Sequence, residues 1–92
     1  MSGLTQHAKA RMQQRGISTT ALESLLAYGA EAHDHYGATV IYFDKKARTR
    51  LLKGSGRKRY GAIEKQLNAY AVIGADGAVL TVGHRSRRIP RL

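Results

Sequence analysis

The stretch Leu67–Arg88, which reads LNAYAVIGADGAVLTVGHRSRR, decides the fold. Two β-prone runs flank Asp76-Gly77, a pair that favours a two-residue type I′ turn and so predicts a β-hairpin. The register set by this turn puts three pairs on an apolar core face: Ile73–Leu80, Ala71–Val82 and Ala69–His84. Because side chains alternate along a strand, the opposite face carries a mixed, reachable set: Val72–Thr81, Tyr70–Gly83 and Asn68–Arg85.

The mixed face of this hairpin predicts an anion site. Tyr70 is expected to lie across Gly83 and cover its bare backbone. Thr81 and Arg85 share the face, and a hydroxyl with a guanidinium can hold a phosphate. Further positive charge follows where the strand ends, at His84, Arg87 and Arg88. The alternative is a strand that simply ends in a basic surface tail.

The composition points to a nucleic-acid binder. A chain of 92 residues makes a single domain, 1–92, with one modest core. It carries 16 Lys and Arg against 6 Asp and Glu, a net charge of +10. A small domain this basic most simply binds nucleic acid, and the alternatives are an anionic membrane surface or an acidic protein partner.

Several classes of protein are not indicated. No run approaches the roughly 18 apolar residues of a membrane-spanning helix, and the N-terminus has no apolar signal segment. The chain has no cysteine, which excludes disulfides and thiolate metal sites. We therefore expect no membrane association, and a cytoplasmic location follows by default.

Helical and strand signals alternate along the rest of the chain. One helix is predicted over Leu4–Gln14, and a second begins after the capping residue Ser18 and runs to about Tyr28. Strands are expected over Glu31–Tyr36 and Thr39–Phe43. The expected fold class is therefore α+β: two N-terminal helices packed on a curved antiparallel sheet of about four strands, with a basic helical insert.

The basic insert is predicted to begin with a helix over Lys45–Lys53, capped by Asp44 and broken at Gly54-Ser55-Gly56. The insert from Lys45 to Arg59 contains eight cations and no acid, which favours contact with a phosphate backbone. A solvated charged helix is the alternative. The candidate nucleic-acid-binding residues are Lys45, Lys46, Arg48, Arg50, Lys53, Arg57, Lys58 and Arg59, together with Arg85, Arg87 and Arg88.

A row of polar residues on the first predicted helix suggests catalysis. His7, Arg11 and Arg15 are spaced four apart and share one face. Metal-independent RNA cleavage needs an acid and a base, which suit histidine, and cations around the phosphate, which suit arginine. On the residues alone, a solvated helix edge is favoured over this catalytic row.

A metal site is considered and rejected. His33 and His35 point to one face of a predicted strand, and Glu31 lies two positions earlier. No third histidine follows at a diagnostic spacing, so a solvated edge strand is favoured. We predict no metal and no other cofactor.

Two end motifs resemble a known family. HAKARMQQRGIS at His7–Ser18 is similar to the opening H-A-x-x-R-M-x-x-R-G-I of the bacterial domain-of-unknown-function family 4258, and VLTVGHRSRRI at Val79–Ile89 resembles its closing strand. That family has been grouped with RelE-like and barnase/EndoU/colicin-like RNase toxins, which have an α+β fold with a curved antiparallel sheet. The resemblance implies roles for His7, Arg11, Arg15 and Thr81; the basic insert departs from the shorter pattern expected.

These observations lead to one functional hypothesis, one rival and a third alternative, a protein that only binds an acidic antitoxin or regulator. The first is a small RNase-like domain that cleaves RNA without a metal, with a toxin of a toxin–antitoxin pair as its narrower form. His7 or His84 would be the acid or base, His84 being added from its position and chemistry. Its partners would be RNA rather than DNA, and an acidic antitoxin protein. The rival is a non-catalytic nucleic-acid-binding module that uses the same cations.

Overall fold

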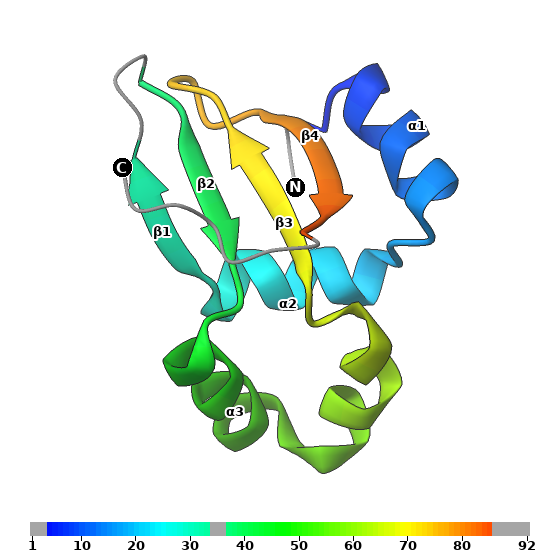
Figure 1. The fold of residues 1–92 in the computed structure, drawn as a ribbon, viewed down its shortest axis with the longest axis vertical. Coiled ribbons are helices and arrows are strands. Elements are labelled where there is room, and N and C mark those ends of the chain that lie inside the picture. The colour runs from blue at the N-terminus through cyan, green and yellow to red at the C-terminus, as the bar shows by residue number, and fades with distance from the viewer. Residues whose placement is uncertain (1–3, 34–36, 86–92) are drawn as a thin grey trace.

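The helices and strands follow the order expected from the sequence. The computed structural model describes residues 4–33 and 37–85. Its four strands form one antiparallel sheet in the order β1-β2-β3-β4 (Figure 1). The elements are α1 (Gln6–Arg15), α2 (Thr19–Tyr28), β1 (Ala30–His33), β2 (Thr39–Tyr42), α3 (Lys45–Ile63), the 3₁₀ turn η1 (Glu64–Gln66), β3 (Ala69–Ile73) and β4 (Val79–His84). The predicted α+β class is confirmed.

The helix ends were predictable because their signals are local. Ser18 Oγ accepts a hydrogen bond from the backbone N–H of Ala21 at 3.1 Å. Asp44 Oδ1 accepts one from Ala47 at 2.7 Å. Gly16 ends α1 in the left-handed region, with φ 64° and ψ 34°. The two side-chain bonds, and the bonds from the Gly16 N–H to the carbonyls of α1, satisfy backbone groups that a helix end leaves without partners.

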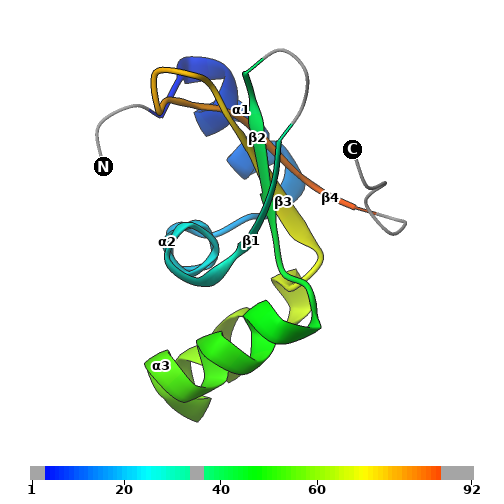
Figure 2. The same ribbon diagram turned by 90° about the vertical axis from the view of Figure 1, so that its left-hand side faces the viewer.

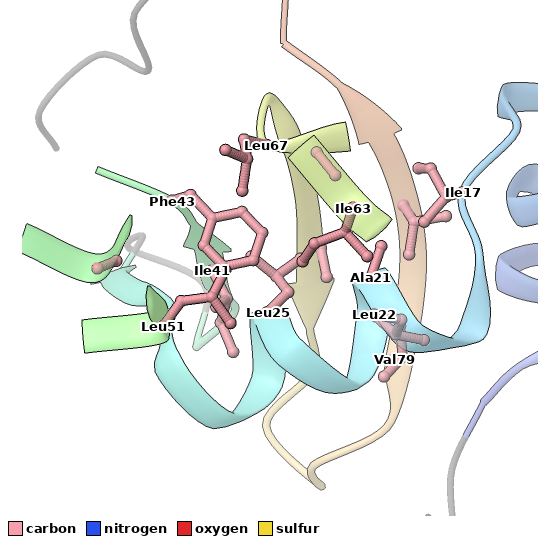
Figure 3. Packing of buried hydrophobic residues seen from close by; sticks show 14 of the residues in the cluster. Ile17, Ala21, Leu22, Leu25, Ile41, Phe43, Leu51, Ile63, Leu67 and Val79 are labelled. Carbon is pink, nitrogen blue, oxygen red and sulfur yellow. The ribbon is translucent and has the colours of Figure 1, made fainter. Parts of the chain in front are cut away.

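The hydrophobic core lies on one side of the sheet, the side on which α2 and α3 are found. α2 covers one face, and α3 lies below the sheet on the same side as α2 (Figure 2). The core between them contains Leu22 and Leu25 of α2, Leu51 and Ile63 of α3, and the fully buried Phe43 (Figure 3). No helix of the described chain covers the opposite face of the sheet, which is called the open face below.

The N-terminal segment protects the outer edge of β4. Leu4 forms a parallel bridge with Val79, and the Thr5 N–H donates to the Val79 carbonyl at 3.2 Å. The Thr5 hydroxyl donates to the Leu80 carbonyl at 3.1 Å. α1 then runs beside β4 (Figure 1), so an edge that would otherwise be open to pairing is occupied.

The hairpin turn differs from the prediction. Asp76 does not have a positive φ, which excludes a type I′ turn. Instead, the N–H of Gly77 donates to the carbonyl of Gly74 at 2.9 Å, and the N–H of Gly74 donates to Ala78 at 2.8 Å. The loop therefore has three residues, and its last residue, Gly77, has φ 87°. This is the pattern of a type I turn followed by a glycine bulge.

A β-bulge in β4 restores the predicted register for most of the hairpin. Ile73 pairs with Val79 instead of Leu80, while Val72 pairs with Thr81, so Leu80 is an extra residue in β4. Beyond this bulge, Ala71–Val82, Tyr70–Gly83 and Ala69–His84 pair as predicted. The prediction for Leu80 is wrong. Val79 is 2% exposed and faces the core, whereas Leu80 is 40% exposed.

The basic helix is longer than predicted. α3 spans Lys45–Ile63 as two helical limbs that meet at Gly56, where φ is 86° and ψ is 168°. Gly54 and Ser55 continue the first limb, and Gly54 packs so closely on Tyr28 that a Cβ there would lie 2.5 Å from the Tyr28 hydroxyl. Of the predicted Gly-Ser-Gly break, only Gly56 interrupts the helix.

Replacing Gly77 with valine is expected to lower the free energy of unfolding by roughly 1–3 kcal/mol, because a β-branched residue resists the left-handed backbone. No neighbouring atom lies within 4 Å of the position that a Cβ would take, so the loss would come from the backbone alone. Gly77→Asn should lose less, since asparagine tolerates positive φ. Urea unfolding measures both variants, and a Gly77→Val protein as stable as the parent would contradict this loop.

Candidate functional site

The open face of the sheet presents two rows of side chains. Ile41, Ala71 and Val82 pair across three strands and are buried in the core. Residues on either side of them along each strand must point the opposite way. The open face therefore carries one row of Ala32, Val40, Val72 and Thr81 and another of Ala30, Tyr42, Tyr70 and Gly83.

Two tyrosines lie at the centre of this face. Tyr42 of β2 and Tyr70 of β3 are direct cross-strand partners, and both are half-buried. Tyr70 also pairs with Gly83, and a Cβ at Gly83 would lie 3.0 Å from the Tyr70 ring. The prediction that Tyr70 covers Gly83 is confirmed. No role for Tyr42 could be predicted from the sequence, because the pairing of β2 with β3 has no local sequence signal.

Arg85 is held at one end of the open face. Its backbone N–H donates to Asn68 at 2.8 Å, and its Nη2 donates to the carbonyl of Phe43 at 2.6 Å. The guanidinium carbon lies 5.3 Å from the centre of the Tyr42 ring, which is within cation–π range. Its buried Nε has no hydrogen-bond partner among the described residues. Arg85 therefore supplies a positive charge in a defined position.

α1 carries the pair His7 and Arg11, and Arg11 Nε donates to His7 Nε2 at 3.4 Å. The buried Ala8 faces β4. On one flank of α1, Lys9, Met12 and Gln13 line a hollow of about 820 Å³ with the start of α2. At 3.6 residues per turn, His7 and Arg11 lie on the other flank, toward the open face. Because the Thr5 hydroxyl is bonded to the Leu80 carbonyl, the N-terminal end of α1 lies beside the first half of β4, the strand that carries Thr81.

Arg15 and His84 meet at the other end of α1. His84 Nε2 donates to the backbone carbonyl of Arg15 at 2.6 Å, and Nδ1 lies 2.8 Å from Asn68 Oδ1. Both ring nitrogens are therefore engaged within the protein. The bond to Arg15 satisfies a carbonyl at the end of α1 that has no partner within the helix. His84 pairs with Ala69 on the core side, so it points away from Thr81.

The predicted catalytic residues therefore divide into two groups. His7, Arg11 and Thr81 border the open face, whereas Arg15 and His84 lie together at the end of α1. α1 and β4 do meet, as expected from the sequence, but His84 joins the helix to the strand. Its ring therefore has a structural role, and the candidate chemistry rests on His7, Arg11 and Thr81.

The cations of α3 form a second basic surface, separate from the open face. Two of them make structural contacts: Arg50 donates to the Tyr28 carbonyl at the end of α2 at 3.1 Å, and Arg48 approaches the Leu67 carbonyl at 3.5 Å. The other six side chains are exposed, namely Lys45, Lys46, Lys53, Arg57, Lys58 and Arg59. α3 itself lies below the sheet on the side of α2, opposite the open face (Figure 2). Arg87 and Arg88 lie outside the described residues.

The described residues contain neither a candidate metal site nor a candidate membrane span. Across residues 4–33 and 37–85, no three His, Cys, Asp or Glu side chains gather in a way that would hold a metal ion. His33 Nδ1 lies 3.0 Å from the Thr39 hydroxyl, and His35 falls outside the described residues. None of the described helices has the length and apolar character needed to cross a bilayer.

Comparisons with known proteins identify one family. Comparison with curated proteins and with solved structures found no match. The family model "Domain of unknown function (DUF4258)" matches residues 4–82, which include α1, the basic α3 and most of the final hairpin. Since this match spans most of the chain, the protein belongs to the DUF4258 family.

Proposed function

We propose that the protein binds RNA and cleaves it without a metal ion, at the border between α1 and the open face. The observation that carries the proposal is the His7–Arg11 pair, which flanks a sheet face bearing Thr81 and Arg85. An imidazole nitrogen and two guanidinium groups are thus gathered around a surface that no described helix covers. These are the groups that phosphodiester cleavage requires.

The chemistry uses the 2′-hydroxyl of RNA as the nucleophile. His7 Nε2 exchanges its 3.4 Å contact with Arg11 for one with the substrate and takes the proton of the 2′-hydroxyl. The 2′-oxygen forms a bond to phosphorus while the bond from phosphorus to the 5′-oxygen breaks, and that oxygen takes a proton from water. Arg11 and Arg85 stabilise the negative charge that develops on the phosphate, and Thr81 donates a hydrogen bond to it. The products are a 2′,3′-cyclic phosphate and a 5′-hydroxyl.

A narrower form of this proposal follows from the end motifs. These motifs resemble the DUF4258 family, and the grouping of that family with RelE-like and barnase/EndoU/colicin-like toxins supports an RNase toxin of a toxin–antitoxin pair. An acidic antitoxin would then be the protein partner, and the net charge of +10 supports such a partner because opposite charges steer association. RNA is favoured over DNA because the proposed chemistry needs a 2′-hydroxyl.

A non-catalytic nucleic-acid-binding module is the second candidate. It is favoured by one observation: both ring nitrogens of His84 are bound within the protein, which leaves the proposed site with a single histidine. The same basic surfaces would then bind RNA without cutting it.

The test is incubation of several RNAs with the purified protein in the presence of a chelator. We expect cleavage to shorter fragments that end in a cyclic phosphate, detected by gel mobility and by mass spectrometry. A His7→Ala protein purified in parallel controls for contaminating nucleases. Binding without cleavage on every RNA would refute the enzyme and support the binding module, and absence of both would refute the whole proposal.

A further inference from the structure

We propose that Tyr42 and Tyr70 form a stacking platform for the unpaired bases of single-stranded RNA. This inference deepens the proposed function, on which it rests for the nature of the ligand, by naming the form of RNA that the open face accepts. It assigns to the centre of the sheet a binding role that is distinct from the chemistry at the α1 border.

The placement of Tyr70 suits stacking. Its ring lies so close to the backbone of Gly83 that a Cβ there would be 3.0 Å from the ring, and this contact restrains the side chain. The neighbouring side chains of the next row, Val72 and Thr81, are short. A ring that is already restrained by packing loses little conformational freedom when a base stacks on it, which favours binding.

Tyr42 extends the platform to the neighbouring strand. It is the direct partner of Tyr70, and adjacent strands lie about 4.8 Å apart, so the two rings lie next to each other. Arg85 lies 5.3 Å from the centre of the Tyr42 ring and is anchored to the Phe43 carbonyl. Its guanidinium is placed to meet a phosphate beside a stacked base. Two aromatic rings and one cation therefore lie within a short distance of one another.

The chemistry of the face favours RNA over a protein partner. Its described residues carry no carboxylate, and cations border it at Arg11 and Arg85. The whole chain has a net charge of +10, which complements a polyanion. The face also offers aromatic rings together with charge, which is the combination that proteins use to bind single strands.

Single strands are favoured over duplexes because of where their bases lie. In an RNA duplex the bases are stacked on one another, and the deep, narrow major groove hides their edges. Only an unpaired base can lay its flat face on a tyrosine. Stacking on an aromatic side chain strengthens binding by about 1–3 kcal/mol per base, or roughly 5- to 150-fold in affinity.

The test compares Tyr70→Leu with Tyr70→Phe in the full-length chain. Leucine keeps apolar bulk over Gly83 but removes the aromatic ring, whereas phenylalanine keeps the ring and removes only the hydroxyl. Binding is measured to a short 2′-O-methyl single strand, which lacks the cleavage nucleophile, and to a hairpin duplex of the same length. Tyr60→Leu is the matched control, since Tyr60 is a partly buried tyrosine of α3.

We expect Tyr70→Leu to weaken binding of the single strand roughly 5- to 150-fold. Tyr70→Phe and Tyr60→Leu should remain within about 2-fold of the parent, and duplex binding should not change with any of them. Since the chain has no tryptophan, quenching of tyrosine fluorescence by the bound strand is a second readout, which Tyr70→Leu should reduce. Melting curves verify that each variant is folded; if Tyr70→Leu is not, Tyr42→Leu takes its place.

The outcomes separate the platform from the proposed function. Binding that depends on Tyr70 without any cleavage by the parent would support the platform and refute the catalysis. Cleavage with equal binding by Tyr70→Leu and Tyr70→Phe would support the function and overturn the platform. A loss of binding in Tyr60→Leu equal to that in Tyr70→Leu would also overturn it, as would a parent that binds no single strand at low salt. If Tyr70→Leu converts a dimer into a monomer and leaves RNA binding intact, the face binds a second copy instead.

Discussion

Raising the salt concentration from 50 to 200 mM should weaken RNA binding about 300-fold if about six phosphates are contacted. Each neutralised phosphate of a single strand releases counterions and contributes about −0.7 to the slope of log K against log salt, so six contacts give a slope of about −4. The net charge of +10 and the seven exposed cations of α3, six of them besides Arg50, supply enough charge for this number of contacts. Fluorescence anisotropy at four or more salt concentrations measures the slope.

The contribution of α3 is tested by replacing four exposed lysines with glutamine, at Lys45, Lys46, Lys53 and Lys58. If all four contact phosphates, the slope should become less negative by up to about 3, with weaker binding at every salt concentration. Lys65→Gln, an exposed cation on η1, is the control and should change the slope by less than about 1. An unchanged slope in the fourfold variant would show that RNA contacts other cations, and a flat salt dependence in the parent would refute binding driven by charge.

Replacing His7 with alanine should slow RNA cleavage roughly 100-fold or more, because it removes the proposed base. Arg11→Ala should also slow cleavage, since a cation beside the developing charge is lost. RNA affinity should change far less with His7→Ala, because His7 is exposed and its only described hydrogen bond is the 3.4 Å contact with Arg11. Single-turnover cleavage rates and binding of an uncleavable strand are measured on the same preparations.

Two further variants make this result specific. Gln13 lies on the opposite flank of α1, so the Gln13→Ala protein should cleave RNA at the parental rate. His84→Ala removes the contact that ties β4 to the end of α1 and the contact with Asn68, so its main effect should be a loss of about 1–3 kcal/mol in the free energy of unfolding. Cleavage that survives His7→Ala would keep the enzyme and refute this site. A large loss of cleavage in a fully stable His84→Ala protein would show that His84 takes part in the cleavage reaction.

Local features of this fold could be predicted from the sequence because their causes act over a few residues. Ser18 and Asp44 bind backbone groups three residues later, and Gly16 provides a left-handed residue at the end of its own helix. Alternation along β3 and β4 separated the core face from the reachable face. For the same reason, the placement of Tyr70 across Gly83 was correct, since both residues belong to one hairpin.

The bulge at Leu80 shows where local reasoning stops. Two alternative loops are compatible with the sequence around Asp76, one of two residues and one of three. The strand registers that they set differ by one residue. The three-residue loop shifts the pairs nearest the turn, and the extra residue in β4 then restores the others. Burial of Val79 beneath α1 and against the core stabilises this solution, and neither contact can be inferred from the hairpin alone.

What the sequence by itself determined is the order and kind of the elements, the capped starts of α2 and α3, the α+β class and the strong positive charge. Only the tertiary structure decided which chemical groups meet. Tyr42 lies opposite Tyr70 because β2 and β3 pair across the intervening α3, and His84 bonds Arg15 because α1 docks against an edge strand far along the chain. The physical reason is that capping and side-chain alternation depend on neighbours in the chain, whereas the docking of distant segments depends on how the whole core packs.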